Sequence, residues 1–433
     1  QKEDFNDWEK LGAKGWNYDN VISYFRKLEN YQGKESQYHG SLGNMIVSEL
    51  NNNNPSCHAW VEAAKEFGLP ANKDFNGETT YGVGSYQFSS TGRMRYSSAT
   101  AFLKPAMKRS NLTVKTNALV SKVLFNKNKA IGIEWIENDE VKTAYSNCEV
   151  ILCGGSLQSP QILQLSGIGP AELLKKHNIP IIFDSPEVGQ NLQDHYQVRG
   201  IVKLKNNNGS VNNQSRNPFK IAEWGLRWLL FGSGPLTCGA GQVGGAACSK
   251  FSKNGRPDLQ FNVMPLSVDK PGEPLHNYPG FTASVWQCHP ESRGSLKIKS
   301  TDPKEQAEIR PEYLSTKLDQ DVIVDGIKMI RSIFNQPSFR DLWEKEMLPG
   351  DSVKSDEEIL HWAKHNGGTV FHAVGTCRMG NDNKSVVDEE LNVRGVENLR
   401  VIDASVMPQV TSANTNAPSL MIGEKGVSFI TKN

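Results

Sequence analysis

The sequence lacks any long hydrophobic run. Its most apolar window, residues 224–236, is interrupted by Arg227 and by glycines, whereas a membrane-crossing helix needs roughly 18 or more consecutive apolar residues. The sequence also lacks an excess of one charge, because 48 Lys and Arg residues balance 47 Asp and Glu residues. We therefore expect a soluble chain with no membrane span, no nucleic-acid partner and no acidic membrane surface as a partner.

Cysteine is scarce. The seven cysteines in 433 residues form no CxxC pair, which excludes a disulfide scaffold and argues against a zinc site. A signal peptide is absent too, because Gln1 opens directly onto charged residues, and the missing start Met indicates a processed or truncated N-terminus. Four Asn-x-Ser/Thr sequons favour a secreted, extracellular glycoprotein, although an Asn-rich chain also produces them by chance. The sequons lie at Asn111, Asn208, Asn213 and Asn383.

The composition is otherwise ordinary, and the pattern of apolar residues predicts two sheets. Short runs between residues 111 and 153 predict an antiparallel meander and then a strand buried on both faces. Longer alternating segments from about residue 196 to 349 predict a second antiparallel sheet. The predicted strands are 111–116, 119–125, 130–135, 141–146, 149–153, 197–204, 259–266, 281–289, 295–299 and 399–402. The predicted helices are 18–28, 57–67, 319–334, one from residue 357, and 417–430.

The most informative stretch is residues 149–170, EVILCGGSLQSPQILQLSGIGP. An apolar strand ends at two glycines, Ser159 is suited to cap a helix, and Pro160 suits a first helical position. A strand, glycine turn and helix is how α/β proteins admit a cofactor at the carboxyl end of a sheet. On these residues alone, a plain strand-to-helix turn is the more frequent explanation.

This stretch resembles the second signature of the glucose–methanol–choline (GMC) oxidoreductases. The pattern GSxxSPxILxxSGIG runs in register from Gly155 to Gly169, and five further blocks resemble the same family in the same order, so that the likeness covers essentially the whole chain. Within the family, the sequence looks closest to the glucose-dehydrogenase-like animal branch. The further blocks are 16–19 (WNYD), 188–195 (VGQNLQDH), 372–380 (HAVGTCRMG), 400–408 (RVIDASVMP) and 414–418 (NTNAP).

The resemblance implies FAD as cofactor and oxidation of an alcohol by hydride transfer to flavin N5. Carried over by motif, His372 is the active-site base and Asn414 holds the substrate oxygen. These roles suit the chemistry, because neutral imidazole accepts a proton near pH 7 and an amide forms hydrogen bonds without titrating. The electron acceptor that reoxidises the flavin is oxygen or a quinone.

The resemblance also implies a set of cofactor contacts. Asn416 is expected to cap the last helix, whose positive N-terminal end would face the flavin pyrimidine. Asp403 ends a short strand and would approach cofactor hydroxyls or, through water, the pyrophosphate, although an ordinary turn Asp has the same pattern. Val120 matches a position whose backbone contacts the adenine, and otherwise reads as a core valine. The expected cofactor-binding residues are Val120, Gly154, Gly155, Asp403, Ala404, Asn416, Ala417 and Pro418.

Three other patterns are decoys. Gly239, Gly241 and Gly244 form a GxGxxG that follows no strand and has no acidic residue at the required distance, so we expect a flexible loop on the substrate side. His361 and His365 share one helical face without the Glu of HExxH, which favours a solvated surface over zinc. The adjacent pair 194–195 (Asp-His) is expected to be structural, because sequence neighbours seldom face each other.

Family members carry a strand–GxGxxG–helix segment before the first block, and it is not present in this sequence. We therefore expect an α/β plus α+β fold in which a partial, Rossmann-like FAD-binding domain (97–196 and 378–433) carries an inserted substrate-binding domain (33–96 and 197–377), with 1–32 connecting them. A missing N-terminal segment or partner chain would complete the first domain. The rival functions are a flavin-containing lyase on the same scaffold and an inactive, cofactor-free relative.

Overall fold

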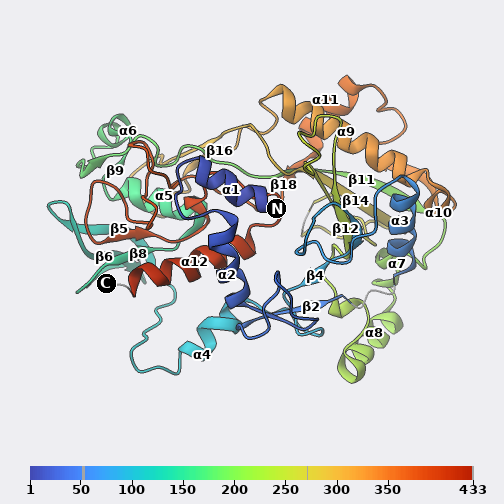
Figure 1. Ribbon diagram of the computed structural model, residues 1–433, viewed down its shortest axis with the longest axis horizontal. Coiled ribbons are helices and arrows are strands. Elements are labelled where there is room, and N and C mark those ends of the chain that lie inside the picture. The colour runs from blue at the N-terminus through green and yellow to red at the C-terminus, as the bar shows by residue number, and fades with distance from the viewer. Residues whose placement is uncertain (51–53, 271, 432–433) are drawn as a thin grey trace.

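The computed structural model of the chain describes residues 1–50, 54–270 and 272–431. These residues form two lobes, each with its own hydrophobic core. Figure 1 shows the lobes side by side, with the C-terminal helix in the left lobe and the largest sheet in the right lobe. The first two helices lie where the lobes meet, and their side chains belong to the core of the left lobe.

The right lobe is built on a six-stranded sheet in which every pairing is antiparallel, as predicted for the second sheet. The strand order is β12-β13-β14-β11-β17, and β18 pairs with the start of β11. The strands are β11 (Tyr196–Leu204), β12 (Val243–Ala247), β13 (Leu259–Met264), β14 (Gly280–Gln287), β17 (Trp343–Leu348) and β18 (Gly368–Thr369).

The two faces of this sheet differ. Alternate side chains such as Val198 and Val285 lie in a core shared with the helices, and the residues between them, including Gln197 and Trp286, point to the opposite face. Burial of each large apolar side chain in such a core contributes about 1.5 to 3 kcal/mol. The helices that contribute to this core are α3 (Pro55–Glu66), α9 (Lys317–Phe334), α10 (Pro337–Arg340) and α11 (Asp356–Asn366).

The left lobe combines an antiparallel three-stranded sheet, β5-β6-β7, with a parallel pair, β8 and β19. The parallel pair joins distant parts of the chain, because Val150 lies opposite Leu399. The elements of this lobe are α1 (Lys2–Lys10), α2 (Tyr18–Leu28), β5 (Leu119–Asn126), β6 (Lys129–Glu137), β7 (Glu140–Tyr145), β8 (Val150–Leu152), α5 (Gly155–Leu165), β19 (Leu399–Val401), the 3-10 turn η3 (Ala404–Val406) and α12 (Asn416–Ile430).

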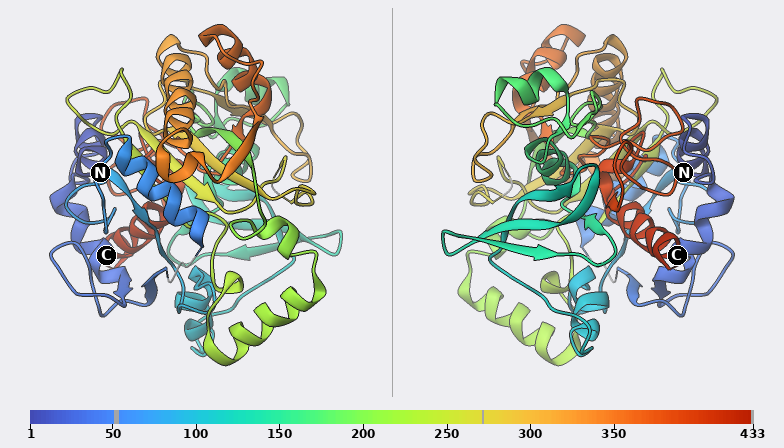
Figure 2. Two further views of the ribbon diagram at one scale, coloured as in Figure 1. Left: turned by 90° about the vertical axis from the view of Figure 1, so that its right-hand side faces the viewer. Right: turned by 90° about the vertical axis from the view of Figure 1, so that its left-hand side faces the viewer.

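Smaller elements lie around these two cores. Figure 2 shows α8 projecting from the bottom of the molecule in both views. The remaining helical segments are η1 (Ala99–Leu103), α4 (Lys104–Ala106), α6 (Ala171–Lys176), α7 (Val211–Gln214), α8 (Pro218–Phe231) and η2 (Pro235–Thr237). The remaining strands are β1 (Glu29–Tyr31), β2 (Met45–Glu49), β3 (Gly82–Ser85), β4 (Gln87–Phe88), β9 (Ile168–Gly169), β10 (Phe183–Asp184), β15 (Ser295–Lys297) and β16 (Glu308–Arg310).

Several predicted elements need correction. The predicted strand 111–116 is wrong, because these residues are exposed and pair with no strand in the described part of the chain. Residues 295–297 do form a strand, but it pairs with β16 outside the large sheet. The strand at 149–153 is not buried on both faces, since Ile151 is 38% exposed. Alternation alone does not say which partner a strand finds or whether anything covers it.

The helix after the double glycine begins earlier than predicted. It starts at Gly155, so Pro160 lies inside the helix and Ser159 is not its cap. The Ser159 hydroxyl instead accepts the Gly154 N–H and donates to Asp403. The helix ends as expected, with Gly167 in the left-handed conformation at φ +86°.

Candidate active site

His372 stands at the centre of a chain of hydrogen-bonding groups where the two lobes meet. Its Nε2 lies 2.9 Å from Asn414 Nδ2, and its Nδ1 lies 3.0 Å from His195 Nδ1. The Nε2 of His195 in turn lies 3.0 Å from the backbone oxygen of Cys288. The structure therefore brings the two predicted catalytic residues together and adds His195, which follows β10 and immediately precedes β11.

The backbone of His372 is held by the neighbour of His195. Asp194 accepts the His372 N–H through Oδ1 at 2.9 Å, and its Oδ2 accepts the hydroxyls of Tyr313 and Thr369. The residue before His372, Phe371, has a left-handed backbone at φ +64°, a conformation that costs energy for a bulky residue. Asp194 and Thr369 thus fix a strained turn that carries the imidazole.

The Asn414 loop is anchored just before the amide. Val410 donates its N–H to Gln193 Oε1 at 3.1 Å, and Ser412 donates its N–H to Asp4 of α1 at 3.0 Å. Gln193, Asp194 and His195 are consecutive, so one segment, residues 193–195, supports both His372 and the loop that carries Asn414. Asn414 itself is exposed and so faces the open side of the site.

The histidines of the site are uncharged at neutral pH. Burial lowers the pKa of His372 to about 4. Burial and the neighbouring His372 together lower the pKa of His195 to about 3. Burial raises the pKa of Asp194, and the hydroxyl donors Thr369 and Tyr313 oppose that rise. A neutral imidazole with one free lone pair is the form that accepts a proton.

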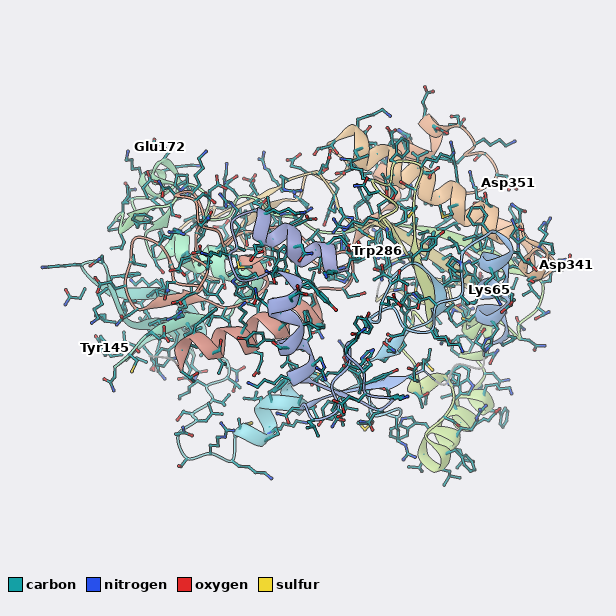
Figure 3. The ribbon with its side chains drawn as sticks, viewed as in Figure 1. Lys65, Tyr145, Glu172, Trp286, Asp341 and Asp351 are labelled. Atoms are coloured by element: carbon teal, nitrogen blue, oxygen red, sulfur yellow. The ribbon has the colours of Figure 1, made fainter. Side chains whose placement is uncertain are left out.

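The large sheet forms one wall of the site. The Trp286 ring of β14 lies 6.2 Å from the rings of both His195 and His372, measured between centroids, and Trp286 pairs across the sheet with Gln197. Figure 3 labels Trp286 in the middle of the molecule, between the lobes. The face of the sheet that turns away from the helices therefore reaches the imidazole of His372.

Four of the residues predicted to bind the cofactor lie together close to His372. Gly155 donates its N–H to Asp403 Oδ2 at 2.9 Å, and Ser156 donates its hydroxyl to the backbone oxygen of Ala373. The start of α5 therefore lies next to both the η3 turn and the residue after His372. This contact network places Gly154, Gly155, Asp403 and Ala404 together, with Asn414 leading into α12 at the same place.

The residues present fit an anionic cofactor. Gly155 has a left-handed backbone at φ +75°, with open space where a Cβ would stand, so another molecule has room to approach the chain there. No side chain caps α12, and Asn416 and Ala417 are exposed, which leaves a positive helix end free for negative charge. Thr415 rather than Asn416 occupies the cap position, so the predicted cap is wrong by one residue, and Pro418 lies in the first turn as expected.

Asp403 and Val120 differ from the other predicted residues. Asp403 is 8% exposed, and its two oxygens accept four hydrogen bonds, from the Gly155 and Ser405 N–H groups and from the Ser159 and Ser405 hydroxyls. With both oxygens engaged in hydrogen bonds, the Asp403 carboxylate holds the η3 turn against the start of α5. Val120 lies on β5, where it pairs with Trp135, and α5 packs against β5.

The structure also locates the three patterns described above as decoys. Gly239 and Gly241 lie in a loop, and Gly244 lies in β12 rather than at a helix start, so rejection of the dinucleotide fingerprint is confirmed. The His361 and His365 rings are 4.5 Å apart on α11, and no group of three or more potential metal ligands occurs in the described residues. Asp194 and His195, expected to be structural, both contact His372, Asp194 through the backbone N–H and His195 through the ring.

Comparison with known proteins assigns the family. The models of the GMC oxidoreductases match residues 1–197 and 290–423. An alcohol dehydrogenase (acceptor) of Pseudomonas putida is 38% identical over 443 residues, which cover 100% of this chain and 78% of the relative. Human mitochondrial choline dehydrogenase is 36% identical over 430 residues, with 99% and 72% covered. The chain belongs to the GMC oxidoreductase family.

The solved structures agree with this assignment. An FAD-dependent oxidoreductase from Chaetomium thermophilum superposes with a TM-score of 0.91 at 26% identity, and the match covers 100% of this chain and 83% of that one. The family and its structural neighbours are FAD-dependent flavoproteins, which confirms FAD as the cofactor. The mixed α/β fold of the family and the assignment as an enzyme are also confirmed.

Two finer expectations find no support. The relatives are alcohol and choline dehydrogenases, which does not single out the glucose-dehydrogenase-like animal branch. The expectation of a partial FAD-binding domain is not supported, because the N-terminal family model matches residues 1–197. In the described part of the chain, no helix is long and apolar enough to cross a membrane.

Proposed function

We propose that this chain oxidises an alcohol to a carbonyl compound, with His372 as the base and Asn414 as the group that holds the substrate oxygen. The proposal is carried by one observation: a buried, neutral imidazole presents Nε2 to the open side of the site, 2.9 Å from the Asn414 amide. The relatives named above oxidise alcohols or choline, which supports the same reaction class.

FAD, when bound, supplies the flavin N5 that accepts hydride from the carbinol carbon. The protein has to prepare the alcohol for that loss. The hydroxyl proton passes to His372 Nε2, so that negative charge builds up on the oxygen and the adjacent C–H bond weakens. The Asn414 amide donates a hydrogen bond to the same oxygen and fixes its position without taking up a proton.

The surrounding structure keeps this base in place and in the right state. Asp194 holds the backbone of His372, and the wall formed by Trp286 excludes water from the buried side of the ring. The free helix end of α12 faces the place where negative charge would collect, next to Asn414. Each of these residues comes from a different part of the chain, and they meet only in the folded state.

The test is anaerobic flavin reduction. The purified chain is incubated with FAD, gel-filtered and mixed with a panel of primary alcohols that includes choline. Loss of the oxidised flavin absorbance on addition of an alcohol supports the proposal. Cleavage of an added cyanohydrin to a carbonyl compound and cyanide, with no change in flavin absorbance, would instead assign a lyase, and retained flavin that no alcohol of the panel reduces would overturn alcohol oxidation as the function.

A further inference from the structure

We infer that His195 is a positioning residue that fixes the tautomer of His372, so that Nε2 of His372 is always the nitrogen with the free lone pair. The inference rests on the proposed role of His372 and assigns a function to a residue beyond the two that the reaction needs directly. It follows from the donor and acceptor properties of three groups in a row.

The row ends at a group that only accepts. A backbone oxygen has no proton to give, so the 3.0 Å contact between Cys288 O and His195 Nε2 requires a proton on that nitrogen. His195 is fully buried and neutral, and a neutral imidazole carries a single ring proton. Nδ1 of His195 therefore holds a lone pair.

That lone pair determines the state of the next ring. His195 Nδ1 lies 3.0 Å from His372 Nδ1, and two lone pairs at this distance would repel each other. His372 must therefore donate from Nδ1, which leaves the lone pair of the neutral ring on Nε2. Nε2 is the nitrogen that faces Asn414, and the amide hydrogen at that contact is consistent with an accepting nitrogen.

The same geometry stops the proton at His372. When the O–H bond of the substrate breaks, its proton forms an N–H bond at His372 Nε2, and the Nδ1–H of the resulting cation still donates to His195. A charge-assisted hydrogen bond of this kind is stronger than a neutral one. His195 cannot pass a proton on, because its far side faces a carbonyl oxygen. The pair therefore stabilises the cation locally and does not form a wire to the solvent.

Gln at position 195 is a matched control. The oxygen and nitrogen of its amide are spaced much as the two imidazole nitrogens are, so the oxygen accepts from His372 while the NH₂ donates to Cys288 O. Leu at the same position fills space but offers no acceptor. A purely structural role of His195 predicts the same His372 tautomer and the same rate of flavin reduction in both variants. Tautomer control predicts that only His195→Gln keeps the wild-type tautomer and rate.

The first readout needs neither flavin nor substrate. Nitrogen NMR of the chain labelled with ¹⁵N-histidine separates protonated from lone-pair ring nitrogens, and the His372 signals are assigned by their loss in His372→Ala. We expect Nδ1 protonated and Nε2 bare in the wild type and in His195→Gln, and a mixture of the two tautomers in His195→Leu. A wild-type His372 that carries its proton on Nε2 would overturn the inference, even if every variant failed to fold.

The second readout is the rate of flavin reduction at saturating alcohol. An unsatisfied buried donor is costly, so we expect His195→Leu to be slower by about 10- to 100-fold, with a smaller change in KM, and His195→Gln to recover to within about threefold of the wild type. Equal rates in the wild type and His195→Leu, or equal losses in both variants, would refute positioning by His195. If no alcohol reduces the flavin of the wild type, the proposed function is refuted but the inference about His195 is not. The NMR measurement tests that inference without flavin or substrate.

Discussion

Two buried histidines in this molecule differ in charge: His39 is protonated at neutral pH, whereas His372 is neutral. His39 contacts Glu29 at 2.9 Å and Asp74 at 3.0 Å, whereas His372 contacts His195 and Asn414. Burial by itself lowers the pKa of His39, but the hydrogen bonds to Asp74 and Glu29 outweigh burial and raise that pKa to about 9. Burial lowers the pKa of His372 to about 4, with no carboxylate to oppose it.

The comparison shows that depth does not decide the charge. The two residues are only 2% and 6% exposed, and burial lowers the pKa of both rings, so the opposite directions of the net shifts come from the partners. Carboxylates make His39 a fixed cation that joins β1 to the loop at residue 74. Neutral partners leave His372 uncharged, as the proposed role of a base requires. The neighbouring acid Asp194 contacts the backbone N–H of His372 rather than the ring.

Removal of the base is expected to have the largest effect. His372→Ala should slow flavin reduction by about 100-fold or more, because a positioned base contributes about that much. Stopped-flow absorbance with saturating alcohol measures the rate. His361→Ala, on the exposed face of α11, is the control and should change nothing. Unchanged reduction in a folded, flavin-loaded His372→Ala would remove the catalytic assignment.

A sharper test gives His372 a carboxylate partner of the kind that His39 has. Asn414→Asp places a carboxylate at Nε2 of His372, and a charge at that distance should move the acid limb of the rate profile to higher pH by about 1 to 3 pH units. Below that limb the base is already protonated, so flavin reduction falls. Asn414→Ala loses the hydrogen bond but adds no charge. It should lower the rate at all pH values and leave the limb where it is, and a limb that stays in place in both variants would contradict the account.

The His39 cluster should affect stability and leave the chemistry unchanged. His39→Gln leaves Glu29 and Asp74 near each other without a cation, and loss of hydrogen bonds to charged groups costs about 1 to 3 kcal/mol of unfolding free energy. Urea unfolding monitored by tryptophan fluorescence gives the value. The rate of flavin reduction per bound flavin should stay the same. A stable variant with a large loss of rate would show that His39 belongs to the site.

The smallest expected effect is the pH dependence of stability, which has opposite signs in the two clusters. The pKa of His39 is raised above its ordinary value of 6.5, so its contribution is complete below about pH 6.5 and is lost as the pH rises through about 9. The pKa values of His372 and His195 are depressed, so their contribution is complete above about pH 6.5 and is lost as the pH falls through about 4.

Matched variants isolate these two slopes. Unfolding free energies are measured by urea titration from about pH 5 to about pH 10. The wild type should lose stability at high pH, by an amount on the order of 1 kcal/mol, and His39→Gln should not show this loss. In the double variant His195→Gln with His372→Gln, the unfolding free energy should decrease less at low pH than it does in the wild type. Identical curves for the wild type and both variants would mean that neither cluster has the charge assigned to it.

The sequence predicts local elements better than their partners. The helix at residues 18–28 is observed with the predicted bounds, because its apolar spacing and its Asn17 cap are local signals. Residues 111–116 alternate in the same way as the strands that follow, yet remain unpaired, because pairing depends on a neighbour that no local pattern encodes. The divisions at residues 97, 197 and 378 stay predictions, although residues 1–32, predicted to connect the domains, contribute to the core of the left lobe.

The site was predictable only where a motif carried it. Only the family resemblance predicts His372 and Asn414 as site residues, since a single His before a Gly-rich stretch indicates nothing by itself. Nothing in the sequence singles out His195, because it adjoins Asp194 and neighbouring side chains in an extended segment point in different directions. In the fold both residues do reach the same target, one through the imidazole and one through the backbone N–H. The distance of 177 positions between His195 and His372 leaves no local trace.

The parallel pairing of β8 with β19 also bears on the order in which the protein is made. Residues 150–152 find their partners only at 399–401, and Arg400, almost fully buried, bonds Glu149 at 2.7 Å. During synthesis the left lobe therefore waits, with an open strand edge, until nearly the whole chain has left the ribosome. The right lobe, whose sheet closes earlier, has time to fold first. A chain that stops short of residue 399 would keep one lobe and lose the site.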